Sequence, residues 1–180
     1  MPSTDVPLRW ELARDEGFRY IVRSGEVAAS SVQAHSARVV ATGLDSAHDY
    51  FYRFRNGSVL SETGRTRTLP APNREPREFH LALACCQHLE HGQWAALRHI
   101  ARAAPDLLVH VGDYIYEGAT TPDRVRGHVG GNCATLADYR RRYAQYRMDP
   151  ALQVAHAASP WITTWDDHEV ANDYSGIYSA

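Results

Sequence analysis

Three short polar clusters contain most of the residues in this chain that could do chemistry, and each follows a run of apolar residues. They are Cys85-Cys86-Gln87, the string GDYIYE at 112–117 and the string WDDHEVAND at 165–173. Carboxylate oxygen is a hard ligand for di- or trivalent cations, and one carboxylate can bridge two of them. A strand buried in a parallel sheet reads as a continuous apolar run, and open α/β sheets bind ligands just beyond the carboxyl ends of their strands. We therefore expect the three clusters to meet at one edge of a sheet.

The last two clusters each also have a purely structural interpretation. Asp113 and Tyr116 can reach one point from the same turn, but Asp113 could instead cap that turn while Tyr116 packs in the core. The WDDHE string is costly to bury unless a cation compensates its carboxylates, which predicts a bound cation. Its alternative is an exposed polar loop in which His168 is an ordinary surface residue. Three flanking aromatic residues argue against full exposure: Trp161, Trp165 and Tyr174.

Cysteine and histidine residues near the clusters need separate interpretation. A cysteine that ends a strand is most often a small buried hydrophobe, and Cys85 fits that description. Pleat alternation alone does not decide whether Cys85 or Cys86 faces the site. The string HLEH at 88–91 offers two histidine ligands three residues apart, but it lacks partner cysteines and the HExxH spacing of zinc peptidases, so a zinc site there is not favoured. His110 lies within an apolar strand and is interpreted as a core histidine whose ring nitrogens are satisfied by hydrogen bonds.

The elements that must position these clusters follow from the hydrophobic pattern. Apolar runs predict strands at 79–85, 107–111 and 161–165. Helical periodicity predicts helices at 93–103, 136–147 and 150–157. The first two strands and the helix between them form a β-α-β unit, in which the strands are parallel and end at the same edge. The second part of the chain is therefore predicted to be α/β.

Residues 8–69 show a different pattern, which predicts an antiparallel sheet with one face exposed to solvent. The predicted strands include 18–23, 36–41, 50–55 and 62–69. Asn56-Gly57 suits a tight hairpin turn, because both residues tolerate positive φ. The three prolines in 70–76 predict an extended linker. We expect a partial β-domain at 1–70, a Pro-rich linker at 71–77 and an α/β domain at 78–180.

Composition excludes some classes of protein. A net charge of -2 and a pI near 6.5 give no general electrostatic case for binding nucleic acid or an acidic membrane. No apolar stretch approaches the roughly 20 residues that a membrane span needs, and residues 1–16 contain no signal-peptide core. Three cysteines, two of them adjacent, do not form a regular disulfide framework.

Taken together, the clusters resemble those of the PhoD-like alkaline phosphatases, a branch of the metallophosphoesterases related to purple acid phosphatases. The resemblance rests on the CCQ string, on the DxxY pattern with a trailing glutamate at 113–117, and on WDDHEVxND at 165–173. A tyrosine-rich stretch at 139–150 and the strings GLDSAHDYFYRF and GRTRTLP agree. The resemblance implies the β-α-β units of a metallophosphoesterase sandwich, preceded by a partial all-β fibronectin-like domain.

The resemblance also implies a metal centre. Cys86, Asp113 and Tyr116 would be ligands of Fe³⁺, and Asp113 would bridge to a second site that holds Ca²⁺. Asp167 would bind the second metal, and Asn172 is a further candidate ligand. Thiolate and phenolate suit a Lewis-acidic iron, whereas carboxylate and amide oxygens suit calcium.

The implied activity is hydrolysis of phosphomonoesters or phosphodiesters by a metal-activated hydroxide, with His168 assisting phosphoryl transfer at the leaving group. A phosphoester substrate is therefore the expected partner. Family members continue for hundreds of residues and supply further metal ligands, so we expect this chain to be a fragment that is weak or inactive alone. Full-length relatives are expected to be exported to the periplasm, cell wall or medium by a twin-arginine signal.

Two other classes of function remain as alternatives. The chain could be a non-catalytic cation-binding module, or an inactive truncated paralogue. A glycosidase site made of Asp166, Asp167 and Glu169 is not favoured, because those enzymes place two carboxyl groups on opposite sides of a sugar rather than three in one loop.

Overall fold

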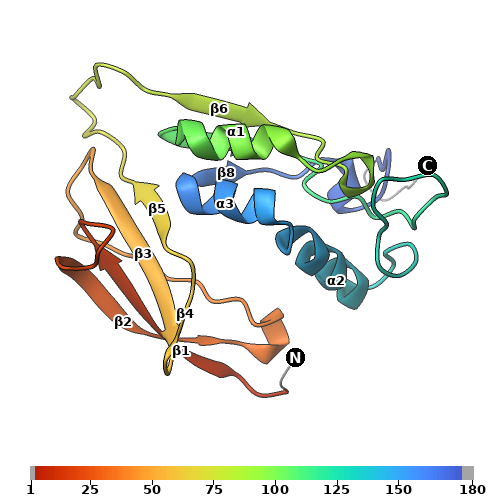
Figure 1. Cartoon of the computed structure of the whole chain (residues 1–180), viewed down its shortest axis with the longest axis horizontal. Coiled ribbons are helices and arrows are strands. Elements are labelled where there is room, and N and C mark those ends of the chain that lie inside the picture. The colour runs from red at the N-terminus through yellow and green to blue at the C-terminus, as the bar shows by residue number, and fades with distance from the viewer. Residues whose placement is uncertain (1–2, 176–180) are drawn as a thin grey trace. The chain divides into compact units, whose positions relative to one another are not determined.

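The computed structural model describes residues 3–175 of the chain (Figure 1). The chain forms two compact units, Met1–Glu78 and Phe79–Ala180. Among the described residues, the first unit contains strands and one short 3-10 turn, whereas the second contains strands and helices.

The first unit is an antiparallel sheet whose strands pair in the order β2-β1-β3-β4, with β5 also pairing with β3. The strands are β1 Val6–Ala13, β2 Ile21–Ala29, β3 Asp49–Asn56, β4 Val59–Leu60 and β5 Gly64–Arg67. A 3-10 turn, η1, spans Ser31–Gln33. The predicted hairpin is confirmed: Asn56 pairs with Val59, and Gly57 between them has a φ of +55°. Tyr50 and Leu12 are buried in this unit.

The strand predicted at 36–41 is wrong. Only Ser36 forms a bridge, to Ser30, and Val40 is 88% exposed. The guanidinium of Arg23 binds the carbonyl oxygens of Thr42 and Gly43 just beyond this segment. The β-branched residues of the segment therefore have no partner strand, and β propensity without a pairing surface does not make a strand.

The second unit contains a parallel sheet in the order β6-β7-β8. Its strands are β6 Leu81–Ala84, β7 Leu107–His110 and β8 Trp161–Thr163. The helices are α1 Ala95–Ala103, α2 Leu136–Arg147 and α3 Pro150–Ala158, and the 3-10 turns are η2 Leu89–His91 and η3 Asp167–Glu169. The predicted α/β character and the parallel β-α-β unit are confirmed, so the carboxyl ends of the three strands share one edge.

Local sequence accounts for where α2 and α3 begin. The side chain of Thr135 accepts the N–H of Asp138, and the Asp138 carboxylate accepts the N–H of Thr135, which forms a capping box before α2. Asp149 caps α3 by accepting the N–H groups of Ala151 and Leu152. These caps determine the residues at which α2 and α3 begin.

The two faces of the parallel sheet differ. On one face Leu108 is fully buried, and Trp161 packs against a core formed largely by α1, α2 and α3. On the other face Leu81, Leu83 and Ile162 are 58%, 67% and 57% exposed. Within the described part of the second unit, no element covers this apolar face, which we call the open face of the sheet.

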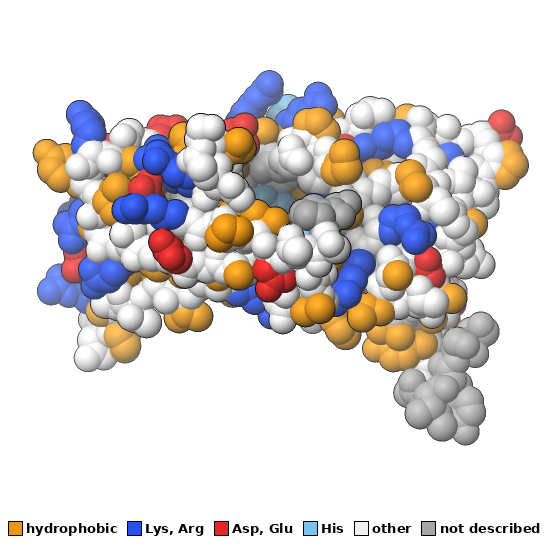
Figure 2. Space-filling view, turned by 90° about the horizontal axis from the view of Figure 1, so that it is seen from below, with side chains coloured by type: hydrophobic (Ala, Val, Ile, Leu, Met, Phe, Trp, Pro, Cys, Tyr) orange, Lys and Arg blue, Asp and Glu red, His pale blue; other side chains and the backbone are white. Residues whose placement is uncertain are grey.

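None of the helices within residues 3–175 has the length and apolar character that a membrane span requires. On the surface shown in Figure 2, basic side chains are spread with acidic side chains among them. The distribution agrees with the small net charge and gives no extended field of one sign on that face.

Candidate metal centre

The ends of β6 and β7 turn sharply and are tied to each other through their backbones. The N–H of Cys86 donates to the carbonyl of Gly112 at 3.2 Å, and the N–H of Gln87 donates to that of Asp113 at 3.1 Å. Cys86 and Asp113 both adopt left-handed conformations, with φ of +54° and +52°. Non-glycine residues are strained there, and such strain is concentrated at functional sites in proteins.

Gly112 allows the loop after β7 to approach the loop after β8. Its φ is +105°, and a Cβ at this position would lie 2.4 Å from the Cβ and 2.8 Å from the backbone nitrogen of Asp166. Any larger residue would push the two loops apart. The glycine that precedes Asp113 is thus required by packing as well as by backbone conformation.

Glu169 holds these loops together from inside. Its side chain is buried, and its Oε1 accepts the N–H groups of Tyr114 at 2.5 Å and Ile115 at 3.3 Å. Its Oε2 accepts those of Asp113 at 3.0 Å and Asp166 at 2.7 Å. One carboxylate therefore organises the turn that carries Asp113 and the start of η3.

Three of the predicted ligands, Cys86, Asp113 and Tyr116, lie together. The hydroxyl of Tyr116 donates to Oδ2 of Asp113 at 2.9 Å. Cys85 and Cys86 are both exposed, so the prediction that Cys85 is a buried hydrophobe is wrong. Partial desolvation, followed by the neighbouring Cys85 thiol and the Asp113 carboxylate, raises the pKa of Cys86 to about 11. Burial and the bond to Asp113 likewise raise the pKa of Tyr116. Both groups are therefore protonated at neutral pH unless a cation displaces their protons.

Asp113 also lies near the cluster that follows β8. Asp113, Asp167 and His168 offer ligand atoms that all lie within 4.8 Å of one another. Asp113 is only 7% exposed, and its Oδ1 has no hydrogen-bond partner among the described residues. The side chain of Asp167 accepts the N–H of Asp173 at 2.6 Å, which lowers the pKa of Asp167 and keeps it ionised. A buried, unpartnered carboxylate oxygen beside a second carboxylate has the electrostatic character of a cation site.

His168 is paired with Glu117, the glutamate that trails the DxxY pattern. The two side chains meet at 2.7 Å through Nδ1 and Oε2. Burial alone would lower the pKa of His168, but the bond and charge of Glu117 outweigh it and hold that pKa above its ordinary value. Oε1 of Glu117 accepts the backbone N–H of Asn172 at 2.7 Å, and the Asn172 side chain donates to Asp173. The structure thus places Asn172 beside the cluster, with its side-chain amide directed to Asp173.

The WDDHE string is less buried than its sequence suggested. Asp166 and Trp165 are exposed, Trp165 by 72%, and only Glu169 is deeply buried. The charge of Glu169 is compensated by backbone N–H groups rather than by a cation. The flanking aromatic residues therefore did not predict the exposure of Trp165. His110 is fully buried as predicted and stacks on Trp161, but the prediction that its ring is satisfied is wrong, because neither ring nitrogen has a hydrogen-bond partner among the described residues.

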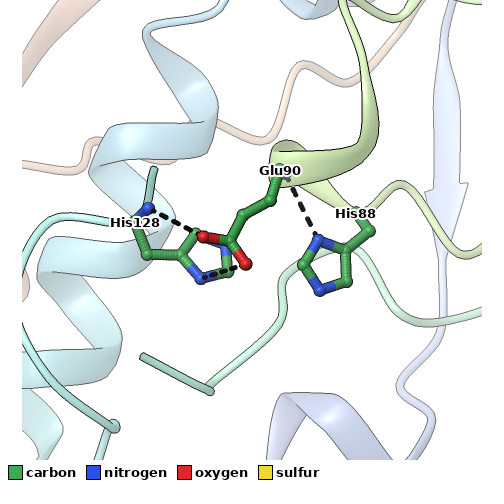
Figure 3. Close-up of side chains that lie close together, drawn as sticks. All are labelled: His88, Glu90 and His128. Carbon is green, nitrogen blue, oxygen red and sulfur yellow. Dashed lines mark hydrogen bonds and ion pairs between the residues drawn. The ribbon is translucent and has the colours of Figure 1, made fainter. Parts of the chain in front are cut away.

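A second group of possible ligands lies beside this cluster and is drawn in Figure 3. The Glu90 carboxylate lies between the rings of His88 and His128, and ligand atoms of the three residues lie within 4.8 Å of one another. Glu90 is 3% exposed and its Oε2 lies 4.0 Å from Nδ1 of His128. Burial, followed by the charges of His91 and His128, lowers the pKa of His88 to about 4.

Hydrogen bonds within the protein already occupy the ring nitrogens of His128 in this second group. Nδ1 of His128 lies 2.9 Å from the carbonyl of Gly118 and 3.1 Å from the guanidinium of Arg142, and Nε2 lies 3.0 Å from the hydroxyl of Tyr146. A buried guanidinium at that distance repels a cation. We therefore interpret His88, Glu90 and His128 as a structural network that joins η2 to α2.

The donor set after the three strands is compatible in its chemistry with the two kinds of metal ion that the resemblance implies. A thiol, a phenol and a shared carboxylate suit a trivalent transition metal, and the carboxylate pair suits a harder divalent ion. The unpartnered Oδ1 of Asp113 is the observation that favours an ion at this point.

Fold and donor set together define a class of protein: an α/β domain with a candidate metal centre at the carboxyl edge of a parallel sheet. Residues 81–179 match the family model described as "PhoD-like phosphatase", and residues 2–70 match "PhoD-like phosphatase, N-terminal domain". The chain belongs to the PhoD-like phosphatase family.

Two relatives show how much of the family architecture the chain represents. The chain is 48% identical to "Alkaline phosphatase D" of Bacillus subtilis (strain 168), in an alignment that covers 97% of this chain and 31% of that protein. It matches a solved structure described as "Structure of PhoD" with a TM-score of 0.93 and 48% identity, over 97% of this chain and 34% of the solved chain. The chain therefore spans about a third of the length of these relatives.

Proposed function

We propose that this chain supplies the first part of a metal-dependent phosphoesterase site, in which Cys86, Asp113 and Tyr116 hold Fe³⁺ and Asp113 and Asp167 hold Ca²⁺. The observation that carries the proposal is the position of Asp113. Its carboxylate accepts the Tyr116 hydroxyl, lies within 4.8 Å of ligand atoms of Asp167 and His168, and has a buried Oδ1 with no partner among the described residues. The reaction would be hydrolysis of phosphomonoesters or phosphodiesters. Asn172 is a candidate outer ligand of the second ion.

The residues of the chain have separate tasks in this proposal. Asp113 would connect the two cation sites, because the same carboxylate contacts Tyr116 and lies within 4.8 Å of ligand atoms of Asp167 and His168. His168 offers a ring nitrogen within 4.8 Å of ligand atoms of Asp113 and Asp167, and it would donate a proton to the leaving oxygen, a role that suits an imidazole. The bound ions would supply positive charge that activates water and stabilises the phosphoryl group.

The open face of the sheet supports a further part of the proposal. Leu81, Leu83 and Ile162 are apolar side chains that a second apolar layer would bury. We propose that this layer is the second sheet of a metallophosphoesterase sandwich, which also carries the remaining metal ligands. A relative that contains both layers would act after export from the cytoplasm.

The first test measures the purified chain alone. Titration with Fe³⁺ should give a visible absorption band from phenolate-to-iron charge transfer, and Asp113→Asn should weaken binding by at least about 100-fold. Asp123→Asn is a matched control, because Asp123 is an exposed aspartate of the same unit. Hydrolysis of p-nitrophenyl phosphate by the chain alone should be weak or absent. Binding of calcium without any iron band would favour a cation-binding module instead.

The second test measures the site in a complete protein. The chain would replace the matching segment of Bacillus subtilis alkaline phosphatase D, with which it shares 48% identity. The hybrid should hydrolyse p-nitrophenyl phosphate, and Asp113→Asn should abolish that activity while Asp123→Asn preserves it. A folded hybrid with no activity would contradict the proposal, and so would robust, Asp113-dependent turnover by the chain alone, because the second layer would then be dispensable.

A further inference from the structure

Glu117 constrains the ring of His168 through one nitrogen. Nδ1 of His168 lies 2.7 Å from Oε2 of Glu117, and both side chains are mostly shielded from solvent, with exposures of 19% and 16%. Oε1 of Glu117 accepts the backbone N–H of Asn172 at 2.7 Å, as an ionised carboxylate does. Since an ionised carboxylate only accepts hydrogen bonds, Nδ1 must carry the proton.

A second contact constrains the plane of the same ring. The Tyr116 ring lies against the His168 ring with centroids 4.1 Å apart and an interplanar angle of 38°. His88 packs on Tyr116 at 4.1 Å, and His91 stacks on His88 at 4.0 Å. The imidazole is therefore held at one edge by Glu117 and on one face by a row of rings that begins at η2.

The backbone fixes Glu117 itself in relation to the cluster. Its second oxygen accepts the N–H of Asn172, so the carboxylate joins the loop after β7 to the segment after η3. Glu169 makes the equivalent connection on the buried side of the same loops. His168 is thus anchored to the loop that presents Asp113 and Tyr116.

We infer that Glu117 is the positioning residue of His168: it fixes the imidazole as the Nδ1–H tautomer, so that the lone pair or proton of Nε2 is presented to the space between Asp113 and Asp167. The inference rests on the proposed phosphoesterase function for its meaning, but the tautomer is a property of the chain itself. A histidine used at a reacting centre generally depends on such a partner at its other nitrogen. Glu117 acts through His168 and need not touch the substrate.

The experiment is long-range ¹H–¹⁵N NMR of the His168 ring in the metal-free chain, at an alkaline pH where the imidazole is neutral. In the wild type, Nδ1 should be the protonated nitrogen, with a slowly exchanging ring proton. Glu117→Gln should preserve this tautomer, because the amide oxygen can accept the same bond. Glu117→Ala should shift the ring towards the Nε2–H form that free histidine favours and speed exchange of the ring proton with solvent at least about tenfold.

Glu75→Gln, at an exposed position in the linker, is the matched control and should leave the His168 ring unchanged. An Nε2–H tautomer in the wild type would overturn the inference, and so would an unchanged tautomer in a folded Glu117→Ala chain. If Glu117→Ala does not fold, the wild type and Glu117→Gln decide the outcome. The measurement uses neither metal nor substrate, so failure of the phosphoesterase proposal would not alter it.

Discussion

Replacement of Glu169 by Gln should destabilise the second unit more than any other single amide-for-carboxylate change in it. The carboxylate accepts four backbone N–H groups, two at each oxygen: those of Tyr114 and Ile115 at Oε1, and those of Asp113 and Asp166 at Oε2. The amide of Gln has one oxygen, and its NH₂ group would face two N–H donors. No rotamer of Gln can satisfy all four.

The size of the effect follows from the two donors that lose their acceptor. A buried N–H without a partner costs about 1–3 kcal/mol, so two cost about 2–6 kcal/mol before relaxation. The two bonds that survive lose the charge of their acceptor and weaken as well. Allowing for partial relaxation, we expect a loss of about 3 kcal/mol, a large share of the stability of an ordinary domain.

Urea unfolding and amide hydrogen exchange would measure the change caused by Glu169→Gln. The urea midpoint should fall by roughly 1–3 M, since unfolding free energy changes by about 1–3 kcal/mol per molar urea. Exchange at the amides of Tyr114 and Ile115 should accelerate most. Asp123→Asn, the exposed control, should leave both readouts unchanged. A Glu169→Gln chain within about 0.5 kcal/mol of the wild type, with normal exchange at those amides, would refute the assignment of Glu169 as the clamp between the loops.

Three further outcomes are expected. Burial lowers the pKa of His156 to about 3. As pH falls from about 6.5 towards 3, the imidazole of the unfolded chain takes up a proton while that of the folded chain stays neutral. The free energy of unfolding that is present above pH 6.5 therefore decreases over this range. His156→Gln should reduce the pH dependence of the unfolding free energy between pH 6.5 and 4 by up to about 1.4 kcal/mol per pH unit. His99→Gln, at an exposed site, should leave that pH dependence unchanged. Equal slopes for the wild type and His156→Gln would contradict the burial argument. Gly112→Ala should cost about 2–4 kcal/mol in urea unfolding, because a Cβ at a φ of +105° would collide with Asp166, and a neutral result would show that the loops separate freely. Asp113→Asn should stabilise the metal-free chain by about 1 kcal/mol in thermal or urea unfolding, since it removes a buried charge of which one oxygen has no partner. The same change should abolish stabilisation by added Fe³⁺, and a destabilised metal-free variant would count against a strained cation site.

Much of the fold could be predicted because the periodicity of the chain changes clearly from one part to the next. The predicted helix at 136–147 coincides with α2, and the apolar runs before Cys85, Gly112 and Thr164 contain the three parallel strands. Parallel pairing then required their polar ends to meet. The segment at 36–41 could not be judged in the same way, because its β-branched residues were recognisable but the absence of a partner strand was not.

The candidate site was predictable only in part. Its donors were visible as residue types, but pleat alternation could not separate Cys86 from Cys85, because Cys86 leaves the pleat through a left-handed φ. The tasks of Glu117 and Glu169 depend on contacts with residues more than fifty positions away, so spacing did not reveal them. One local signal was available: Asp166 and Glu169 have the D-x-x-E spacing of a capping box, which predicts that the glutamate turns back to the backbone.

The open face of the sheet makes the stability of this chain depend on whether an apolar layer binds to it. Because Leu81, Leu83 and Ile162 remain in water, any apolar layer that binds them raises the free energy of unfolding by an amount set by its concentration relative to its dissociation constant. A covalently attached layer acts at the high effective concentration of an intramolecular partner, whereas a separate one must be supplied. Occupancy of this face and order at the strand ends that carry Cys86 and Asp113 are therefore thermodynamically linked, since both belong to the same three strands.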